Sequence, residues 1–536
     1  MSSPHDSTTS SEIPSALAPL RLPVFRMLWG TWLVANTCMW MNDVAAAWLM
    51  TSLTTSPIWV ALVQSASTLP MLLLGLPSGA LADIFDRRRF FIITQFWIAG
   101  VAVLLCLVVA SGGMTPPLLL LLVFANGIGL AMRWPVLSAI LPELVPRAQL
   151  PAALALSGVS MNAARIIGPL VAGALIASAG SLWVFVLNAV LSVLTGFVIM
   201  RWRREHVESP LGREPFFSAM RVGVQFVRQS RRLKAVMLRI FLFFFHSSAT
   251  IALLPLVARD LHGGGAGTFT LLLASMGAGA IVSAMLLPRV RQAMGRDALV
   301  MTGACIQGAT TAAIAFAPNA YIAVPAIFVA GMAWIASANA LSVSAQMALP
   351  DWVRARGMSI YQMAIMGGSA LGAAWWGNLA TVGSLHLSLG TAAISGVLLM
   401  FLAIRLVSDR GVKVDLTPSN EFNRPAVESS PVEGQVQMTV EYRIDPARAD
   451  EFRKLMRASR RSRLRQGALA WELLRDVHDP GRFVEVIIDQ SWTEHLRRFD
   501  RVSAADVELR DQKRRFHIGD NAPVVTRCVV EGEPRG

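Results

Sequence analysis

Few ionisable side chains lie inside the long apolar stretches of this chain of 536 residues, and three of them are the best placed to do chemistry. Asp43 follows Asn42 in the first stretch, Arg133 lies toward the end of the fourth, and Arg165 lies in the middle of the fifth. A charge in an apolar environment is costly, so such a residue needs a partner or has a function. A buried carboxylate favours its neutral form and can take up and release a proton. We predict that Asp43 carries protons with Arg165 or Arg133 as counter-ion; the alternative is a structural ion pair.

Amide and indole side chains in the same stretches are candidates to line a polar cavity between helices. A few placed polar groups and aromatic rings are what a site for a small organic molecule needs. Tryptophan is also common at membrane interfaces, which is the alternative for the indoles. The residues that we expect in the cavity are Asn36, Trp40, Asn42, Asn162, Asn339 and Gln362.

The apolar stretches that hold these residues are long enough to cross a membrane. Hydrophobic residues make up 54% of the chain and charged residues only 15%, whereas soluble domains are about 25% charged. A helix of ~20 apolar residues spans the ~30 Å hydrocarbon layer. The composition therefore predicts an all-α membrane protein. We expect twelve spans, at 24–50, 57–81, 90–111, 116–140, 152–178, 182–202, 235–259, 267–288, 298–317, 321–348, 358–381 and 385–407.

Arginine lies in every second loop between these spans. One set of loops holds 87–89, the run 201–234 and Arg354, whereas loops of the other set, such as 111–117, hold no basic residue; Arg259 departs from the alternation. Basic loops stay on the cytoplasmic side of a membrane, so the pattern predicts a multi-pass protein with both termini in the cytoplasm. The net charge of +14 then reflects loops beside anionic lipid headgroups and not a nucleic-acid partner.

The two halves of the apolar region resemble each other. The run 141–147 follows the fourth span and 349–354 follows the tenth, each with Leu-Pro and an acid. Chance recurrence is the alternative, although the Arg-rich loops after the second and eighth spans share the register. Two six-helix repeats with a binding site between them are a common build of secondary transporters. The expected organisation is a disordered cytoplasmic tail at 1–20, a first half at 21–202, a basic linker at 203–234, a second half at 235–410, a second linker at 411–433 and a soluble domain at 434–532.

The basic linker contains an amphipathic segment. Phe216, Val224 and Val227 fall near one helical face, with Arg221 between them. Such a pattern is typical of a helix that lies on the cytoplasmic leaflet.

The C-terminal segment has the element order βαββαβ. We expect strands at 435–442, 471–477, 483–488 and 524–530, and helices at 446–466 and 493–515. This order is typical of a small α+β ferredoxin-like domain. His495 lies on a charged helix and is expected on a solvated face, so regulation or self-association is favoured over catalysis.

The loop after the second span resembles the signature of the major facilitator superfamily, G-x-x-x-D-R-x-G-R-R. Gly79, Asp83, Arg87 and Arg88 match it, whereas the first Arg and the second Gly of the pattern are replaced. A carboxylate at a helix end can pair with a cation or a helix N-terminus in one state and release it in another. The resemblance therefore implies a cytoplasmic gate; a basic cluster that only sets orientation is the alternative.

The fifth span is similar to the Gly-rich run of drug-proton antiporters, which ends G-x-x-x-G-P-x-x-G-G. Ala164, Gly168, Pro169 and Gly173 occupy its positions, with Ala in place of Gly at 164 and 172. Small residues let helices approach closely, and the proline frees a backbone acceptor. In that family the run marks exporters; generic helix packing is the alternative.

Nearly the whole chain, tail included, resembles the bacterial efflux branch that contains enterobactin exporters and macrolide efflux proteins. One departure is Val123, which stands where the fourth-span motif of the family has an Arg, with Arg133 as the substitute. The resemblance implies an inner-membrane exporter of a drug, siderophore or secondary metabolite, coupled to protons, with no enzymatic activity, cofactor or metal. Its partners are the bilayer, the substrate and protons, and the tail is a candidate for self-association. The alternative is a membrane-anchored enzyme or regulatory protein whose C-terminal domain is the working part.

Overall fold

The computed structural model describes residues 17–84, 86–141, 144–146, 149–202, 216–407, 415–419, 421–422, 425, 434–519 and 521–530, without the side chains at 76, 79, 80, 82–84, 87, 134–139, 151, 216–219, 351 and 355. The chain divides into two compact units. The bundle unit comprises 1–211, 240–340 and 362–401, and the tail unit comprises 212–239, 341–361 and 402–536. Each unit is described by itself below.

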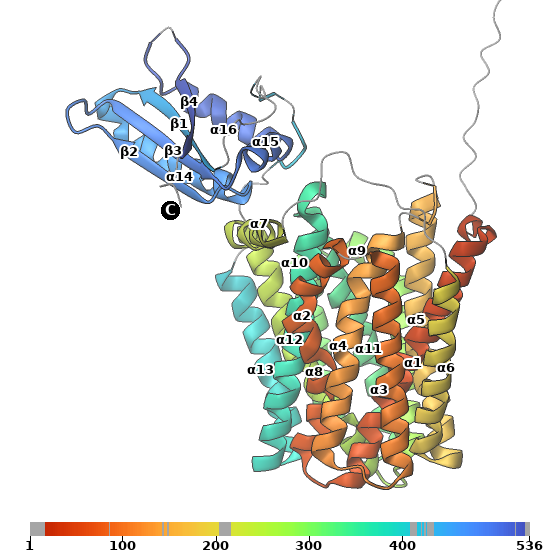
Figure 1. Ribbon diagram of the computed structural model, residues 1–536. Helices are drawn as coiled ribbons and strands as arrows, with labels where there is room; N and C mark the ends of the chain where they lie inside the picture. The colour runs from red at the N-terminus through yellow and green to blue at the C-terminus, as the bar shows by residue number, and fades with distance from the viewer. Residues whose placement is uncertain are drawn as a thin grey trace, which may run out of the picture. The chain divides into compact units, whose positions relative to one another are not determined.

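Long helices, which follow the short 3-10 turn η1 (Ala18–Arg21), form the bundle unit (Figure 1). Their bounds lie within a few residues of the expected spans; the largest difference is at α12, which begins at Asp351 instead of 358. The helices are α1 (Pro23–Leu53), α2 (Pro57–Ile84), α3 (Arg87–Ala110), α4 (Pro116–Ile140), α5 (Leu150–Ala179), α6 (Ser181–Arg201), α8 (Arg231–Asp260), α9 (Ala266–Ala293), α10 (Arg296–Ala315), α11 (Ala320–Met347), α12 (Asp351–Val382) and α13 (Leu385–Leu406).

Among the described residues, ten of these helices are long and apolar enough to cross a membrane. The other two, α1 and α12, are as long, with 31 and 32 residues. Their composition is more polar, because α1 holds Asn36, Asn42 and Asp43 and the first turns of α12 hold Arg354 and Arg356. The polar groups of α1 lie along the helix, whereas those of α12 lie in its first turns.

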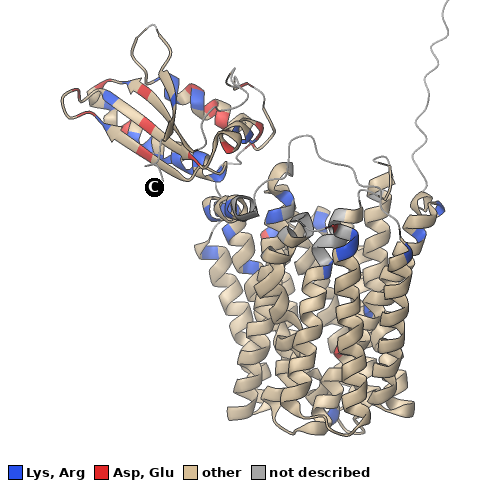
Figure 2. Cartoon of the chain, in the orientation of Figure 1, with Lys and Arg blue, Asp and Glu red and all other residues tan. Residues whose placement is uncertain are grey.

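Basic side chains gather at one end of the helix bundle, as Figure 2 shows. Most of the length of the helices is free of charged residues in the same view. The alternation of arginine along the sequence thus corresponds to one end of the bundle, as the positive-inside bias requires.

Glycine lets the helices of the bundle unit approach closely. A Cβ on Gly279 of α9 would lie 2.0 Å from the Phe328 carbonyl oxygen of α11, and a Cβ on Gly331 of α11 would lie 2.1 Å from the Met276 carbonyl oxygen of α9. This reciprocal contact has no room for a side chain on either helix. Such small-residue contacts are the usual means of packing helices where the hydrophobic effect between them is weak.

The amphipathic helix expected in the linker is present in the tail unit as α7 (Phe216–Gln229). Its buried face is formed by Val222 and Phe226, which are 0% and 1% exposed, whereas Val224 and Val227 of the expected stripe are only half-buried. Protein therefore covers a face of α7 next to the one that the sequence indicates for lipid.

The C-terminal domain contains a four-stranded antiparallel sheet with the order β2-β3-β1-β4. The expected succession of strands and helices is present. One prediction was wrong: the single helix expected at 493–515 is two helices, because Ser503 and Asp506 form a capping box that starts a new one. The elements are β1 (Gln435–Arg443), the turn η4 (Pro446–Arg448), α14 (Ala449–Arg465), β2 (Ala470–Arg475), β3 (Arg482–Asp489), α15 (Trp492–Asp500), α16 (Ala504–Arg514) and β4 (Val524–Val530).

Candidate functional site

Asp43 of α1 makes one hydrogen bond to a described side chain. The Ser67 hydroxyl of α2 donates to Asp43 Oδ1 at 3.2 Å. Among the described residues, neither Arg165 nor Arg133 forms an ion pair with this carboxylate. In this conformation the acid and the two predicted counter-ions are therefore held apart.

Arg133 of α4 is buried, with 4% of its surface exposed. Its Nη2 lies 3.5 Å from Asn36 Oδ1 of α1, and its Nη1 lies 3.5 Å from Gln95 Oε1 of α3. Gln95 is fixed in turn, because its amide donates to Thr195 Oγ1 of α6 at 2.8 Å. Arg133 is thus surrounded by neutral amide oxygens at long hydrogen-bond distance, and of the predicted cavity residues it contacts Asn36.

Arg165 of α5 lies against two indole rings. Its guanidinium carbon is 5.4 Å from the ring centre of Trp40 in α1 and 4.6 Å from that of Trp334 in α11. Both contacts are within the range of cation–π attraction. The sequence indicated Arg165 and Trp40 separately; their contact, and the part taken by Trp334, appear only in the structure.

The other predicted cavity residues lie at different places. Asn42 is buried and accepts a hydrogen bond from the Asn188 amide at 3.3 Å. Asn162 is exposed, and its amide donates to the Gly158 carbonyl of its own helix at 2.9 Å. Asn339 accepts a hydrogen bond from Arg291. Gln362 is half-buried on α12. The structure therefore brings Trp40 to Arg165 and Asn36 to Arg133, and gives Asn42, Asn162 and Asn339 separate partners.

The Gly-rich run of α5 packs this helix against two others at once. A Cβ on Gly168 would lie 2.6 Å from Trp40 Cβ of α1, and a Cβ on Gly173 would lie 1.7 Å from Thr270 Oγ1 of α9. Ala164 is 0% exposed, and Pro169 lies within the helix. The close helix approach predicted from these small residues is confirmed, and it joins an early helix to one from the second part of the chain.

Arg88 is the one residue of the predicted gate whose side chain the structure describes. Its guanidinium donates to the carbonyl oxygens at the end of α6, to Met200 at 2.7 Å and to Trp202. The side chains of Gly79, Asp83 and Arg87 lie outside the described residues. Asp86, which replaces a glycine of the family pattern, accepts a hydrogen bond from the Arg89 amide at 2.9 Å and caps α3. Arg88 therefore ties the start of α3 to the end of α6.

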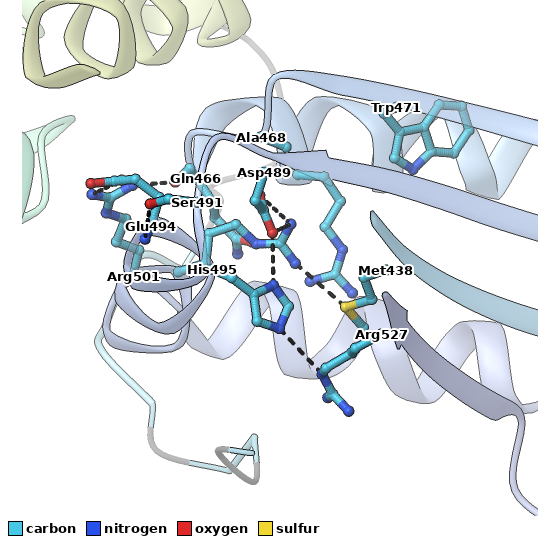
Figure 3. Close-up of polar contacts among 12 residues, drawn as sticks. Met438, Gln466, Ala468, Trp471, Asp489, Ser491, Glu494, His495, Arg501 and Arg527 are labelled. Atoms are coloured by element: carbon cyan, nitrogen blue, oxygen red, sulfur yellow. Dashed lines mark hydrogen bonds and ion pairs between the residues drawn. The ribbon is translucent and has the colours of Figure 1, made fainter. Parts of the chain in front are cut away.

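The C-terminal domain buries a polar cluster around His495. Figure 3 shows Asp489 and Arg527 facing opposite sides of the imidazole ring. Asp489 Oδ2 is 2.7 Å from His495 Nδ1, and Arg527 Nε donates to His495 Nε2 at 3.2 Å. Because Nε2 accepts, Nδ1 carries the proton and donates to Asp489. Arg498 Nη1 donates to both Asp489 oxygens at 2.9 Å.

The prediction that His495 lies on a solvated face was wrong, since its side chain is 0% exposed. Burial lowers the pKa of His495, and the bond to Asp489 opposes this only in part. Burial opposes the ionisation of Asp489, but the charge of Arg498 and the bond from His495 hold its pKa below the usual value. His495 is a neutral ring with both nitrogens occupied, which is a structural arrangement.

A second buried cluster surrounds Glu485 of β3, which is 0% exposed. Its carboxylate accepts from Ser459 Oγ at 2.6 Å, from Trp471 Nε1 at 2.8 Å and from Lys513 Nζ at 3.1 Å. Burial opposes the charge, but Lys513 and Arg463 outweigh it and lower the pKa of Glu485 to about 2. The acid therefore stabilises the domain above its usual pKa of 4.5, and that contribution is lost as pH falls toward 2.

Replacing Lys513 with methionine is expected to destabilise the C-terminal domain by about 3–5 kcal/mol, because it leaves a buried carboxylate without its nearest cation. Hydrogen exchange of 435–530 in the full chain measures the change. Arg453→Met is the matched control, since its pair with Asp450 at 2.5 Å is exposed and is worth less than about 1 kcal/mol. Equal exchange in the two variants would show that the Glu485 cluster does not hold the domain.

Within the tail unit, α7 is in contact with the C-terminal domain and with the start of α12. The Phe226 ring meets the Trp352 ring edge-on, with 5.6 Å between the ring centres. Gln225 Nε2 donates to the Ala468 carbonyl at 3.3 Å, and Arg221 Nη2 donates to Gln490 Oε1 at 3.1 Å. The domain is thus joined by hydrogen bonds and aromatic packing to a helix that precedes it by more than two hundred residues.

Phe226→Ala is expected to loosen this contact by about 3–5 kcal/mol, the usual cost of removing a buried phenylalanine. The backbone amides of 220–229 and of 463–468 should exchange faster with solvent in the full chain. Val477→Ala, at a side chain that is 90% exposed, is the control and should leave exchange unchanged. Wild-type exchange in α7 of the Phe226 variant would contradict the contact.

The helix bundle shares its fold with solved transporters. The nucleoside transporter NupG superposes with a TM-score of 0.60 at 13% identity, covering 71% of this chain and 99% of that one. The fucose:proton symporter FucP of E. coli gives a TM-score of 0.51 at 17% identity, covering 74% and 100%. At such identities the likeness concerns the fold alone.

A family model described as "transmembrane secretion effector" matches residues 14–535, which is almost the entire chain. The chain belongs to this family of the major facilitator superfamily. The family resemblance predicted from the loop after α2 and from the Gly-rich run of α5 is therefore confirmed.

Curated relatives of this family member include efflux proteins. It is 27% identical to macrolide efflux protein A of Streptococcus pyogenes over 271 residues, which are 49% of this chain and 65% of the relative. It is 21% identical to the staphyloferrin A transporter of Staphylococcus aureus over 258 residues, which are 48% of this chain and 64% of the relative. The match thus spans just under two thirds of the length of these relatives.

Proposed function

We propose that the protein is a secondary exporter of the bacterial inner membrane, which moves a small organic molecule out of the cell in exchange for protons. Twelve helices cross the membrane as two six-helix halves, 21–202 and 235–410, and both termini lie in the cytoplasm. The family, the relatives named for efflux and the basic side chains at one end of the bundle support this proposal. The cargo is a drug, a siderophore or a secondary metabolite.

Proton coupling rests on one observation, the environment of Asp43. This carboxylate lies in a transmembrane helix with a neutral hydroxyl as its described side-chain partner. An acid that lacks a cation favours its neutral form in an apolar interior and can change its protonation as access alternates. Arg165 and Arg133 are the cations that it can approach when the helices move.

The predicted gate and the Gly-rich run of α5 have different roles in the transport cycle. Gly79, Asp83, Arg87 and Arg88 form a cytoplasmic gate that closes the ends of the helices in one state. Ala164, Gly168, Pro169 and Gly173 keep α5 in close contact with α1 and α9, so that the path between them stays closed to protons. The close contacts at Gly168 and Gly173 support this part of the proposal.

The C-terminal domain has a regulatory role. Its fold is ferredoxin-like, which the sheet order β2-β3-β1-β4 supports. It follows the linker 411–433, and 203–234 is the basic linker that includes α7. Self-association of this domain would use β4, an edge strand with Val524, Val525 and Val530 at least 41% exposed. Edge strands of this kind pair readily with a second chain.

Everted membrane vesicles from cells that express the full chain test the function. Erythromycin, a macrolide, is the first probe, followed by siderophores and other metabolites. Uptake should follow an imposed proton gradient, collapse with a protonophore and survive deletion of 411–536. No flux of any compound, together with a chemical activity that needs the C-terminal domain, would instead favour a membrane-anchored enzyme or regulatory protein.

A further inference from the structure

Three side chains of the bundle unit present buried N–H donors for which the described residues offer no acceptor. The atoms are Nε and Nη1 of Arg165, Nε1 of Trp40 and Nε1 of Trp334. They belong to one cluster, because the guanidinium lies over both indole rings at 5.4 Å and 4.6 Å. Leaving a buried polar group without a partner is unfavourable, and more so if the group is charged.

The cluster is held in place by the packing around it. Gly168 lies one turn after Arg165. Because it has no side chain, Trp40 packs directly against it: a Cβ on Gly168 would lie only 2.6 Å from Trp40 Cβ. Trp334 also packs against Phe244 of α8, edge-on with 5.4 Å between the ring centres. Packing of this kind around the donors is what pre-organises a binding group.

The charge of the cluster is not balanced within the described residues. Cation–π contacts offset only part of the cost of a guanidinium in a membrane interior. Asp43 accepts its hydrogen bond from Ser67 instead. A cluster made of donors only, with one permanent positive charge, is complementary to an acceptor that carries a negative charge.

We propose that this cluster binds a carboxylate of the exported molecule, so that the cargo is an organic anion. The guanidinium donates charge-assisted N–H bonds to a carboxylate, and its positive charge, unlike that of a lysine, is spread over a plane that stacks on indole rings. The two indoles give the body of the molecule apolar and aromatic surfaces, and their N–H groups complete the coordination of the anion. This inference rests on the proposed export function and specifies the class of its substrate.

Binding of a matched pair of probes to the purified full chain in detergent tests the proposal. The probes are 2-naphthoate and 2-naphthamide, which differ in charge and share the ring. The midpoint of thermal unfolding at increasing probe concentration reports binding, since a ligand of the native state stabilises it by mass action. Naphthoate should bind at least about tenfold more tightly than the amide, as expected for a charge-assisted hydrogen bond.

Variants assign the preference to the cluster. Arg165→Gln should remove it, and Arg165→Lys should keep part of it. Trp334→Phe, which keeps a ring and loses the N–H, should weaken naphthoate alone and provides a test if Arg165→Gln does not fold. Arg259→Gln is the matched control, because that guanidinium donates to the Thr51 carbonyl at 3.0 Å and lies outside the cluster.

Equal binding of the two probes to the wild type, or a preference for naphthoate that persists in Arg165→Gln, would overturn the anion site. A preference for naphthoate that persists in Arg165→Gln would be expected if Arg165 pairs with Asp43 in another state and does not bind the cargo. The binding assay needs no proton gradient, so the two proposals can fail separately. Gradient-driven export without a preference for the anion refutes this site alone, whereas the preference without export refutes the transport function.

Discussion

Replacing Asp43 with asparagine is expected to reduce gradient-driven export to the rate seen without a gradient. The amide has the shape of the carboxylate and its oxygen can still accept from Ser67, so the helix contact is kept. What the amide loses is the ability to bind and release a proton. Exchange of substrate across the membrane without a gradient should continue, because that half-reaction needs no proton movement.

Proteoliposomes with an imposed pH difference separate the two rates. Ser67→Ala is the control, since it removes one hydrogen bond worth about 0.5–1.5 kcal/mol and leaves the acid in place; its rate should fall about tenfold at most. Undiminished gradient-driven transport in Asp43→Asn would show that Asp43 does not carry the coupled protons. Arg133 and Arg165 would then have no acid to pair with in the proposed cycle.

Gly173→Leu is expected to abolish transport and to lower the thermal stability of the protein. Even the first added carbon would lie 1.7 Å from Thr270 Oγ1 and 2.4 Å from Thr270 Cβ, so α5 and α9 must separate. Overpacking in a core costs about 1–3 kcal/mol, and the cost here falls on the contact between α5 and α9, to which we assign a role in the proposed transport cycle. Transport in vesicles and the unfolding midpoint in detergent measure both effects.

The same helix offers the control and the rescue. Gly158 of α5 has open space where a Cβ would stand, so Gly158→Ala should leave transport unchanged and stabilise the helix by about 0.5–1 kcal/mol. Gly173→Ala should be impaired alone and restored by Thr270→Gly, which removes the atoms in conflict. Normal transport in Gly173→Leu would mean that the close contact of α5 and α9 is dispensable.

The helices of this protein could be predicted because their signal is local. Long apolar runs between glycine, proline and charged residues set the bounds of α4 and α6 to within one residue. The start of α12 was missed because Arg354 and Arg356 suggested a loop, whereas the helix already begins at Asp351. Charged residues in the first turns of a helix precede its apolar part, so hydropathy places the start of the helix too late.

The arrangement of the site could be predicted only in part, since it depends on contacts between distant residues. Composition indicated Asp43, Arg133 and Arg165 as unusual, but not which groups surround them. Trp334 approaches Arg165 from a helix 169 residues away in sequence, and no pattern near either residue indicates the contact.

In the C-terminal domain, the sequence was misleading where polar side chains are buried inside the domain. His495 was expected on a solvated face because it lies on a charged helix, and polar faces are usually exposed. Here Asp489 at the end of β3 provides the partner of His495 and Arg498 inside the domain. Ser503, three residues before Asp506, was the local signal for a new helix.

The helix α7 is synthesised long before the C-terminal domain that it contacts. About 240 residues separate Phe226 from Arg465, which lie beside each other in the folded tail unit. At about 5–20 residues per second, the ribosome needs roughly 12–48 s to complete that stretch. During this interval the face of α7 that carries Val222 and Phe226 lacks the domain that covers it in the folded chain.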